Sequence, residues 1–338
     1  MADTTPTELL GLPGPLPAEP ADVPRVISSR PSAADRAFRG LLRFGGIAVF
    51  AIIGLIGGFL IARAWGVFSK AGWSFLTTET WLVAQGHYGV GSILTNGIII
   101  AFIAIAVAVP CALIAALFIS EYAPYALKRP LIALIDLMAA IPSIIYALWG
   151  VFFFQPEVLG FTRWLADHVG PYFPPLRIVG QEMEIAFTAS PFIAGVVVSL
   201  MVIPIIASIC REVFSQAPQG EREAAYALGA SRWAMIRTVV LTYGRGGMIG
   251  AIMLGFGRAM GETIVVTLII SPVYTINWHV LQTGGFSIPS LIALRYTEST
   301  MIPALMAAGL VLFAFTLAVN AAAGVIITRS RSGAQTAD

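Results

Sequence analysis

Apolar residues along the chain gather into six long stretches that are free or nearly free of charge. Each is at least 19 residues long, enough for an α-helix to cross about 30 Å of hydrocarbon. Inside a bilayer, the backbone can satisfy its own hydrogen bonds only in helices or closed barrels. The pattern therefore predicts an all-α, polytopic membrane protein with six transmembrane helices, over residues 44–62, 93–119, 130–154, 185–210, 246–271 and 301–328.

The composition agrees with a membrane protein and argues against several other classes. Of the 338 residues, 57% are hydrophobic and 11% are charged, whereas an ordinary soluble domain has about 25% charged residues. The net charge of +2 does not indicate a concentrated basic surface, so we expect no nucleic acid as a partner. Both cysteines lie in apolar stretches and the three histidines are far apart in the sequence, so we expect no bound metal.

The two ends of the chain differ from its middle. Residues 1–31 contain seven prolines and few large apolar side chains, which predicts a disordered tail. From Ser32 to Arg43, arginines alternate with apolar residues, which predicts a short basic amphipathic helix on the lipid surface. The expected organisation is thus a tail with this helix (1–43), a transmembrane domain (44–328) and a second tail (329–338).

Lysine and arginine are distributed unevenly between the two sides of the predicted spans. Most of them lie in the two tails and in the loops that fall on the same side as the tails. Because cytoplasmic loops carry an excess of Lys and Arg, both termini are expected in the cytoplasm.

The longest charged segment between two spans covers residues 211–245. Its centre predicts a helix that ends near Leu228, a left-handed stop at Gly229 and a second helix capped by Ser231. We expect this helix–turn–helix to stand out into the cytoplasm and to contact another protein.

The first of these two helices carries the residues expected to make that contact. Ala224 and Ala225 are small, so a groove on the other protein could approach the backbone closely. Arg222 and Glu223 are expected to form ion pairs across the same contact.

This segment resembles the EAA loop of ABC importer permeases. The resemblance rests on Glu223-Ala-Ala225, on Gly229 and on Val239-x-Leu241, while Thr242 stands where the family usually has proline. It implies that the segment is the coupling helix that docks on an ATPase subunit. The implied coupling residues are Arg222, Glu223, Ala224, Ala225, Leu228 and Gly229.

The flanking residues are similar to those of PstC-type phosphate permeases. The matching segments are residues 202–214, Gly257 to Thr263 and, more weakly, Ala140 to Ser143. This resemblance implies a type I, MetI-like core that imports inorganic phosphate across the bacterial cytoplasmic membrane. It also implies three partners: a PstA-type second permease, a PstB-type ATPase dimer that uses ATP and Mg²⁺, and a PstS-type external phosphate-binding protein.

The chain itself shows no machinery for hydrolysing ATP. Neither Lys70 nor Lys128 follows a glycine, so the Gly-Lys-Ser/Thr phosphate loop is missing. No compact group of nucleophile, histidine and acid suggests a membrane enzyme either. We therefore expect no catalytic residue and no cofactor bound by this chain.

The fifth apolar stretch contains an arginine, Arg258, at the middle of residues 246–271. An unpaired arginine there costs about 2.5 to 3.5 kcal/mol on insertion scales, and Glu262 follows four residues later, on the same face of a continuous helix. The hypothesis is that Arg258 coordinates passing phosphate and that Glu262 holds it when the path is empty, with Ser143 adding a hydroxyl. The alternative is a buried ion pair that only fixes helix packing.

Three other functions stay open, and one of them is a sensory membrane protein that transports nothing. An ABC permease for sulfate or molybdate would use the same coupling loop. A secondary transporter or channel could use Arg258 and Glu262 as a proton relay without any ATPase.

Two glycines of the fifth apolar stretch, Gly257 and Gly261, allow close approach to a partner permease or tight packing within the chain.

Overall fold

The computed structural model describes residues 32–82, 87–179 and 187–332, and these are largely helical. The expected disordered tail (1–31) and the last six residues (333–338) lie outside the described residues. The chain divides between Gly54 and Leu55 into two compact units.

Helices dominate both units, which confirms the all-α prediction. The strands in the described ranges, β1 and β2, form one antiparallel hairpin of two residues each. Short π-helical turns (η3, η4, η6) and 3₁₀ turns (η5, η7) extend several helices. In chain order the elements are α1 (Ala33–Ala71), α2 (Ser74–Thr77), β1 (Trp81–Leu82), β2 (His87–Tyr88), α3 (Gly91–Leu117), η3 (Phe118–Tyr122), α4 (Tyr125–Ala140), α5 (Ser143–Trp149), η4 (Gly150–Phe154), α6 (Gln155–His168), η5 (Pro174–Leu176), α7 (Pro191–Ser215), α8 (Gln219–Ala227), α9 (Arg232–Met235), η6 (Ile236–Val240), α10 (Leu241–Met260), α11 (Ile264–Ile269), α12 (Ile288–Arg295), η7 (Ser299–Met301) and α13 (Ile302–Ser332).

The described part of the first unit is residues 32–54, which comprise Ser32 and the N-terminal portion of α1 and are almost entirely exposed. The helix begins with a reciprocal cap, because the backbone amide of Asp35 donates to Ser32 Oγ and the amide of Ser32 donates to a carboxylate oxygen of Asp35. The expected surface helix over Ser32–Arg43 is not a separate element. It continues into the first apolar stretch because no proline interrupts residues 33–71.

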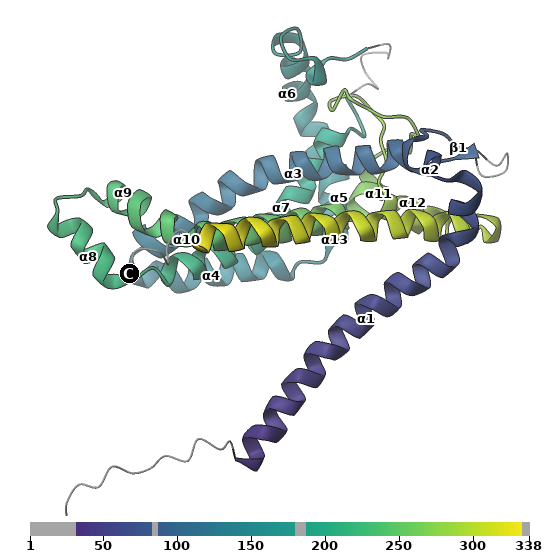
Figure 1. Ribbon diagram of the computed structural model, residues 1–338. Helices are drawn as coiled ribbons and strands as arrows, with labels where there is room; N and C mark the ends of the chain where they lie inside the picture. The colour runs from purple at the N-terminus through teal and green to yellow at the C-terminus, as the bar shows by residue number, and fades with distance from the viewer. Residues whose placement is uncertain (1–31, 83–86, 180–186, 333–338) are drawn as a thin grey trace, which may run out of the picture. The chain divides into compact units, whose positions relative to one another are not determined.

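The second unit is built around α3, α7, α10 and α13, which lie side by side (Figure 1). On α3, five fully buried alanines recur every three or four residues and form a stripe of small side chains facing the core. Small residues let membrane helices approach closely and gain van der Waals contact. The stripe consists of Ala101, Ala104, Ala108, Ala112 and Ala116.

Glycines set the contact between α10 and α7. A Cβ at Gly255 would lie 2.8 Å from side-chain atoms of Ile206 and Val202, and one at Gly247 would lie 2.5 Å from Val213. These distances are shorter than van der Waals contact. The two helices can therefore approach each other this closely only because glycine has no side chain at these positions.

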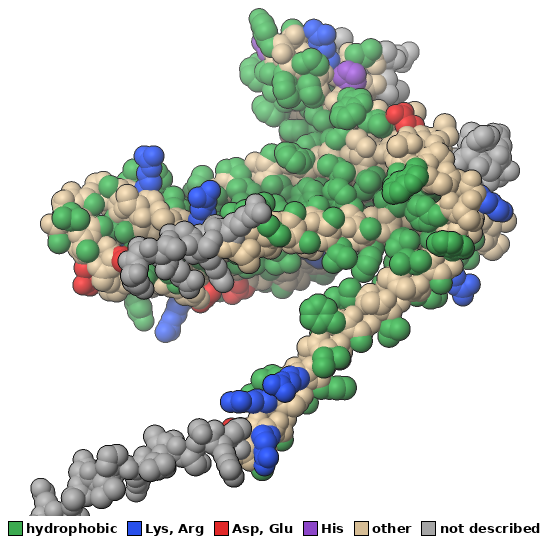
Figure 2. All heavy atoms as spheres, in the orientation of Figure 1, with side chains coloured by type: hydrophobic (Ala, Val, Ile, Leu, Met, Phe, Trp, Pro, Cys, Tyr) green, Lys and Arg blue, Asp and Glu red, His purple; other side chains and the backbone are tan. Residues whose placement is uncertain are grey.

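A second hydrophobic cluster joins the C-terminal part of α1 to α12 and α13. Ala64 and Val67 of α1 are buried there with Leu291 of α12 and Ala308 of α13. Figure 2 shows hydrophobic side chains over most of the length of the bundle, as expected for a surface that faces lipid.

The segment between α11 and α12 is tied to α3 by a buried amide. The side chain of Asn96 donates to the carbonyl oxygen of Thr275 and accepts from the backbone amide of Asn277, both at 2.9 Å. Each of these bonds satisfies a polar group in an otherwise apolar core.

Six helices of the described residues are long and apolar enough to cross a membrane, which confirms the predicted number and a multi-pass protein. They are Ala33–Ala71, Gly91–Tyr122, Ser143–His168, Pro191–Ser215, Arg232–Met260 and Ser299–Thr328.

The third predicted span, 130–154, is wrong as a single helix. The chain is helical to Ala140, is extended at Ile141 and Pro142, and becomes helical again at Ser143. Proline lacks a backbone N–H and forces the residue before it into an extended conformation. The long apolar helix therefore starts at Ser143 and continues through η4 and α6.

The fifth predicted span, 246–271, is also interrupted. Its helix begins earlier, at Arg232, and ends with α10 at Met260. Gly261, Glu262 and Thr263 form a short break before α11. Arg258 is consequently in the last turn of its helix and not in the middle.

Candidate functional site

The helix–turn–helix expected within residues 211–245 is present as α8 and α9, at one end of the bundle (Figure 1). Helix α8 ends at Ala227, and Gly229 follows with a φ of 82°. Ser231 then caps α9, because its side chain accepts a hydrogen bond from the backbone amide of Ala234 at 3.2 Å. The predicted left-handed stop and cap are both confirmed.

The outer surface of this element is rich in exposed side chains that other parts of the chain do not cover. Glu223, Ala224 and Gly229 are exposed, and Leu228 exposes 90% of its surface. Trp233 at the start of α9 is also more than half exposed. Large apolar residues this open are typical of a surface that another protein covers.

Ala225 does not share this surface, contrary to the expected pair of small residues. It is half-buried and packs against the main hydrophobic core. Adjacent helical residues point about 100° apart, so Ala224 faces outward while Ala225 faces the bundle.

Arg222 is likewise turned inward, so it does not make the expected ion pair across the contact. Its Nη1 atom lies 2.9 Å from both carboxylate oxygens of Glu121, in the turn η3. Its Nη2 atom donates to the carbonyl oxygen of Phe214 at 2.6 Å. A buried carboxylate needs a counter-charge, and Arg222 supplies it within the chain.

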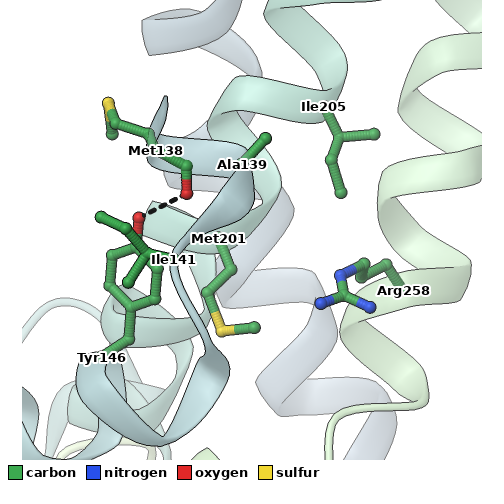
Figure 3. A pocket seen from close by; sticks show the side chains of 7 residues that line it. All are labelled: Met138, Ala139, Ile141, Tyr146, Met201, Ile205 and Arg258. Atoms are coloured by element: carbon green, nitrogen blue, oxygen red, sulfur yellow. Dashed lines mark hydrogen bonds between the residues drawn. The ribbon is translucent and has the colours of Figure 1, made fainter. Parts of the chain in front are cut away.

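A cavity of about 310 Å³ lies between the break in the third span, α7 and α10 (Figure 3). Arg258 is the charged residue among those that line it. The lining residues are Met138, Ala139, Ile141, Tyr146, Met201, Ile205 and Arg258.

The cavity lies at the mid-length of a membrane helix. Met201 and Ile205 come from the central part of α7, Pro191–Ser215. Arg258 and Tyr146 lie on opposite sides of the cavity (Figure 3). The guanidinium is therefore level with the middle of α7, although it belongs to the last turn of α10.

The expected ion pair between Arg258 and Glu262 does not form. Within the described ranges, the salt bridges join Arg222 to Glu121 and Arg295 to Glu298. Glu262 is only 7% exposed, and its Oε1 atom accepts hydrogen bonds from the backbone amides of Ile264 at 3.2 Å and Val265 at 3.4 Å. Because α10 ends before Glu262, the four-residue spacing no longer places the two side chains on one helix face.

The other polar residues near the cavity take different positions. Ser143 is half-buried at the start of α5, directly after the break, but it does not line the cavity. Tyr146, one turn later, does line it, and its hydroxyl donates to the carbonyl oxygen of Met138 at 2.9 Å. The methionines of the lining carry no charge or motif, so the sequence contains no signal that would single them out.

A second cavity, of about 440 Å³, is lined by Tyr274, Leu294, Arg295 and Glu298, with Pro272. Arg295 donates to Glu298 Oε1 at 2.7 Å and to the hydroxyl of Tyr274 at 3.3 Å. Its hydrogen bond to Glu298 and, to a smaller extent, its hydrogen bond to Tyr274 raise the pKa of Arg295 above its usual value.

Residues 108–332 match the model of the family described as binding-protein-dependent transport system inner membrane component. The chain is 36% identical over 299 residues to the phosphate transport system permease protein PstC of Pasteurella multocida, covering 86% of this chain and 91% of the relative. It is 36% identical over 317 residues to the phosphate transport system permease protein PstC 2 of Mycobacterium tuberculosis, covering 91% and 97%.

A solved structure shares the fold at low sequence identity. It is a chain of a bacterial ABC transporter involved in the import of the acidic polysaccharide alginate, with a TM-score of 0.53 and 14% identity. The match covers 87% of this chain and 99% of that chain.

Proposed function

Because the chain belongs to the family of binding-protein-dependent transport system inner membrane components, we propose that it is the permease subunit through which an ATP-driven importer moves inorganic phosphate across the bacterial cytoplasmic membrane. Its fold is that of a type I ABC importer permease. Two relatives that each align with more than nine-tenths of their length are phosphate permeases by name, which supports phosphate as the transported anion.

The observation that carries the proposal is the lone guanidinium of Arg258 in the central cavity. The other lining side chains are apolar except that of Tyr146, whose hydroxyl already donates to the carbonyl oxygen of Met138. In such surroundings an arginine gains most from an anion that can accept two parallel hydrogen bonds. A phosphate ion passing through supplies that partner.

Two further residues border the proposed path. Glu262 holds the first turn of α11 in place, and so shapes the break that follows Arg258. Ser143 begins α5 beside the extended Ile141–Pro142 pair, where its hydroxyl can meet an anion that leaves the cavity.

The exposed tip of α8 and α9 is the proposed docking site for the ATPase. Glu223, Ala224, Leu228 and Gly229 present a mixed charged and apolar surface, which a groove of a PstB-type ATPase dimer would cover. That dimer binds ATP and Mg²⁺, and this chain binds no cofactor. The tip, and with it both termini, then faces the cytoplasm.

The remaining partners are a PstA-type permease and a PstS-type external phosphate-binding protein. The exposed face of α10 that carries Leu254 and Gly257 is available for the second permease. When ATP closes the ATPase dimer, the movement of α8 is passed to the membrane helices, and the access to the cavity changes sides.

Transport by the assembled complex in liposomes tests the function. With ATP inside the liposomes and the binding protein outside, we expect phosphate to be taken up and to stimulate ATP hydrolysis, whereas sulfate and molybdate do neither. Stimulation by sulfate or molybdate alone would show a permease for another oxyanion.

The same liposomes without the ATPase test a secondary transporter. Uptake by this chain without any ATPase would overturn the proposal that it belongs to an ATP-driven importer. The direct ion pair that such a relay would use, between Arg258 and Glu262, is not formed.

A further inference from the structure

The turn η3, at the end of α3, holds a carboxylate that the proposed transport path does not use. Glu121 belongs to this π-helical turn, and only 5% of its side chain is exposed. π-helical turns are uncommon and occur frequently at functional positions. A charge this deeply buried must be balanced by a partner.

The partner comes from α8, about 100 residues later in the chain. Arg222 places Nη1 between the two carboxylate oxygens of Glu121, at 2.9 Å from each. Its Nε atom donates to the carbonyl oxygen of Ala217, and its Nη2 atom donates to that of Phe214. One guanidinium thus joins α8, the end of α7 and the end of α3.

The second helix of the tip, α9, contacts the same turn. Arg232 of α9 donates through Nη2 to the backbone carbonyl oxygen of Glu121. Its guanidinium carbon also lies 4.5 Å from the centre of the Tyr122 ring, a cation–π contact. Helix α8 is therefore attached to Glu121, and α9 is attached to both Glu121 and the next residue, Tyr122.

We propose that Glu121 is a positioning residue that locks the α8–α9 tip to the end of α3, so that movement of the tip is transmitted to the helices around the cavity. We call the contacts of Glu121 and Tyr122 with Arg222 and Arg232 the η3 latch. This inference rests on the proposed docking of an ATPase at the tip.

The packing provides a route from the latch to the cavity. Helix α3 packs along α7 through its alanine stripe, and α7 packs against the glycine face of α10. These contacts are close, and α10 carries Arg258. The tip itself rests on few buried residues, since α8 has none and α9 has only Met235, so the charged contacts are its main attachment to α3.

The test is the number of anions taken up per ATP hydrolysed by the complete complex in liposomes. In Glu121→Gln the side chain keeps its shape and loses its charge, so the contact with Arg222 is weakened while the contacts of Arg232 remain, and α3 follows the tip less closely. We expect ATP hydrolysis to continue while this ratio falls about tenfold, in the range of known coupling energies. Arg222→Lys keeps the charge and should keep most of the ratio.

Two further variants separate coupling from folding. The double variant Glu121→Gln/Arg222→Gln leaves no buried charge unpaired, so it should assemble and still show the low ratio. Glu212→Gln removes an exposed carboxylate near the end of α7 and should leave the ratio unchanged.

Each result bears on the latch separately from the transport function. A wild-type ratio in Glu121→Gln or in the double variant overturns the latch. Failure of both to assemble overturns it too, because Glu121 would then only hold the fold. The ratio is measured for whichever anion the wild-type complex takes up, so an error about phosphate leaves this test intact. A wild-type complex that takes up no anion with ATP shows instead that the proposed function has failed.

Discussion

Arg258 and Glu262 lie on either side of the point where a membrane helix ends. Arg258 occupies the last turn of α10, which stops at Met260. Glu262 is in the break that follows, where its carboxylate accepts hydrogen bonds from the first amides of α11. The carboxylate is therefore engaged with the backbone, and the guanidinium at the cavity is left to a substrate.

Removing the guanidinium should stop transport without disrupting assembly. In Arg258→Ala we expect phosphate uptake to fall by at least about a hundredfold, because a hydrogen bond to a charged group contributes about 1.5 to 3 kcal/mol and Arg258 can donate two. Arg258→Lys keeps the charge but not the paired donors, so uptake should be intermediate. The measurement is uptake of labelled phosphate by complexes matched for subunit content.

Arg129 provides the control for Arg258. It is an exposed arginine on α4, nine residues before the cavity residue Met138. Arg129→Ala should transport normally. Normal uptake in Arg258→Ala would remove Arg258 from the path and leave the cavity without an anion-binding group.

Glu262 should act through its shape more than through its charge. Glu262→Gln keeps an oxygen that can accept from the amides of Ile264 and Val265, so we expect uptake close to that of the wild type. Glu262→Ala removes this cap, which costs about 1 kcal/mol, and should lower both the thermal stability and the uptake. If Glu262→Gln loses uptake as fully as Arg258→Ala, the negative charge itself belongs to the transport path.

The number of spans could be predicted from the sequence because the hydropathy of a stretch depends on its composition. A local break in the helix does not change that composition. The breaks themselves were harder to place. Pro142 is a known helix breaker, yet prolines are tolerated in membrane helices when neighbours satisfy the freed backbone groups. Pro110 and Pro204 lie within continuous helices of the same protein. Only the packing around each proline decides which outcome occurs.

The coupling tip shows the same division between local and long-range information. Gly229 and Ser231 act through their own backbone neighbours, so their roles as stop and cap could be predicted. The inward turn of Arg222 depends on Glu121, which is 101 residues away, and no local pattern indicates this pairing. The break after Met260 likewise removed the expected ion pair of Arg258, because the four-residue rule holds only in a continuous helix.

The turn at Gly229 should be sensitive to any bulky residue. Its φ of 82° costs an L-residue about 1 to 2 kcal/mol, and a side chain there would also stand on the docking surface. We expect Gly229→Leu to hydrolyse ATP without driving uptake. Gly229→Asn, which tolerates this conformation better, should retain more coupling.

The glycine control for this turn lies in α8 itself. Gly220 has an ordinary helical φ, and a Cβ there would meet nothing within 4 Å. Gly220→Ala should therefore couple normally. Unchanged uptake per ATP in Gly229→Leu would show that the tip does not drive transport.

Gly257 and Gly255 lie on the same helix, but they should fail in different ways when enlarged. A Cβ at Gly255 would lie 2.8 Å from Ile206 and Val202 of this chain, whereas a Cβ at Gly257 would meet nothing within 4 Å. Gly255→Leu should therefore destabilise the isolated chain, by about 1 to 3 kcal/mol or more. Gly257→Leu should leave the isolated chain stable and weaken its association with the second permease.

Thermal unfolding of the single chain in detergent and co-purification of the second permease separate these two effects. Gly58→Leu on α1 is the matched control, since a Cβ there also meets nothing within 4 Å and we expect only lipid beside it. A Gly257→Leu chain that brings down the second permease as well as the Gly58→Leu chain does would place the subunit interface elsewhere. If its uptake nevertheless falls, this face of α10 lines the anion path beside Arg258, because the added side chain would then narrow the path without touching another subunit.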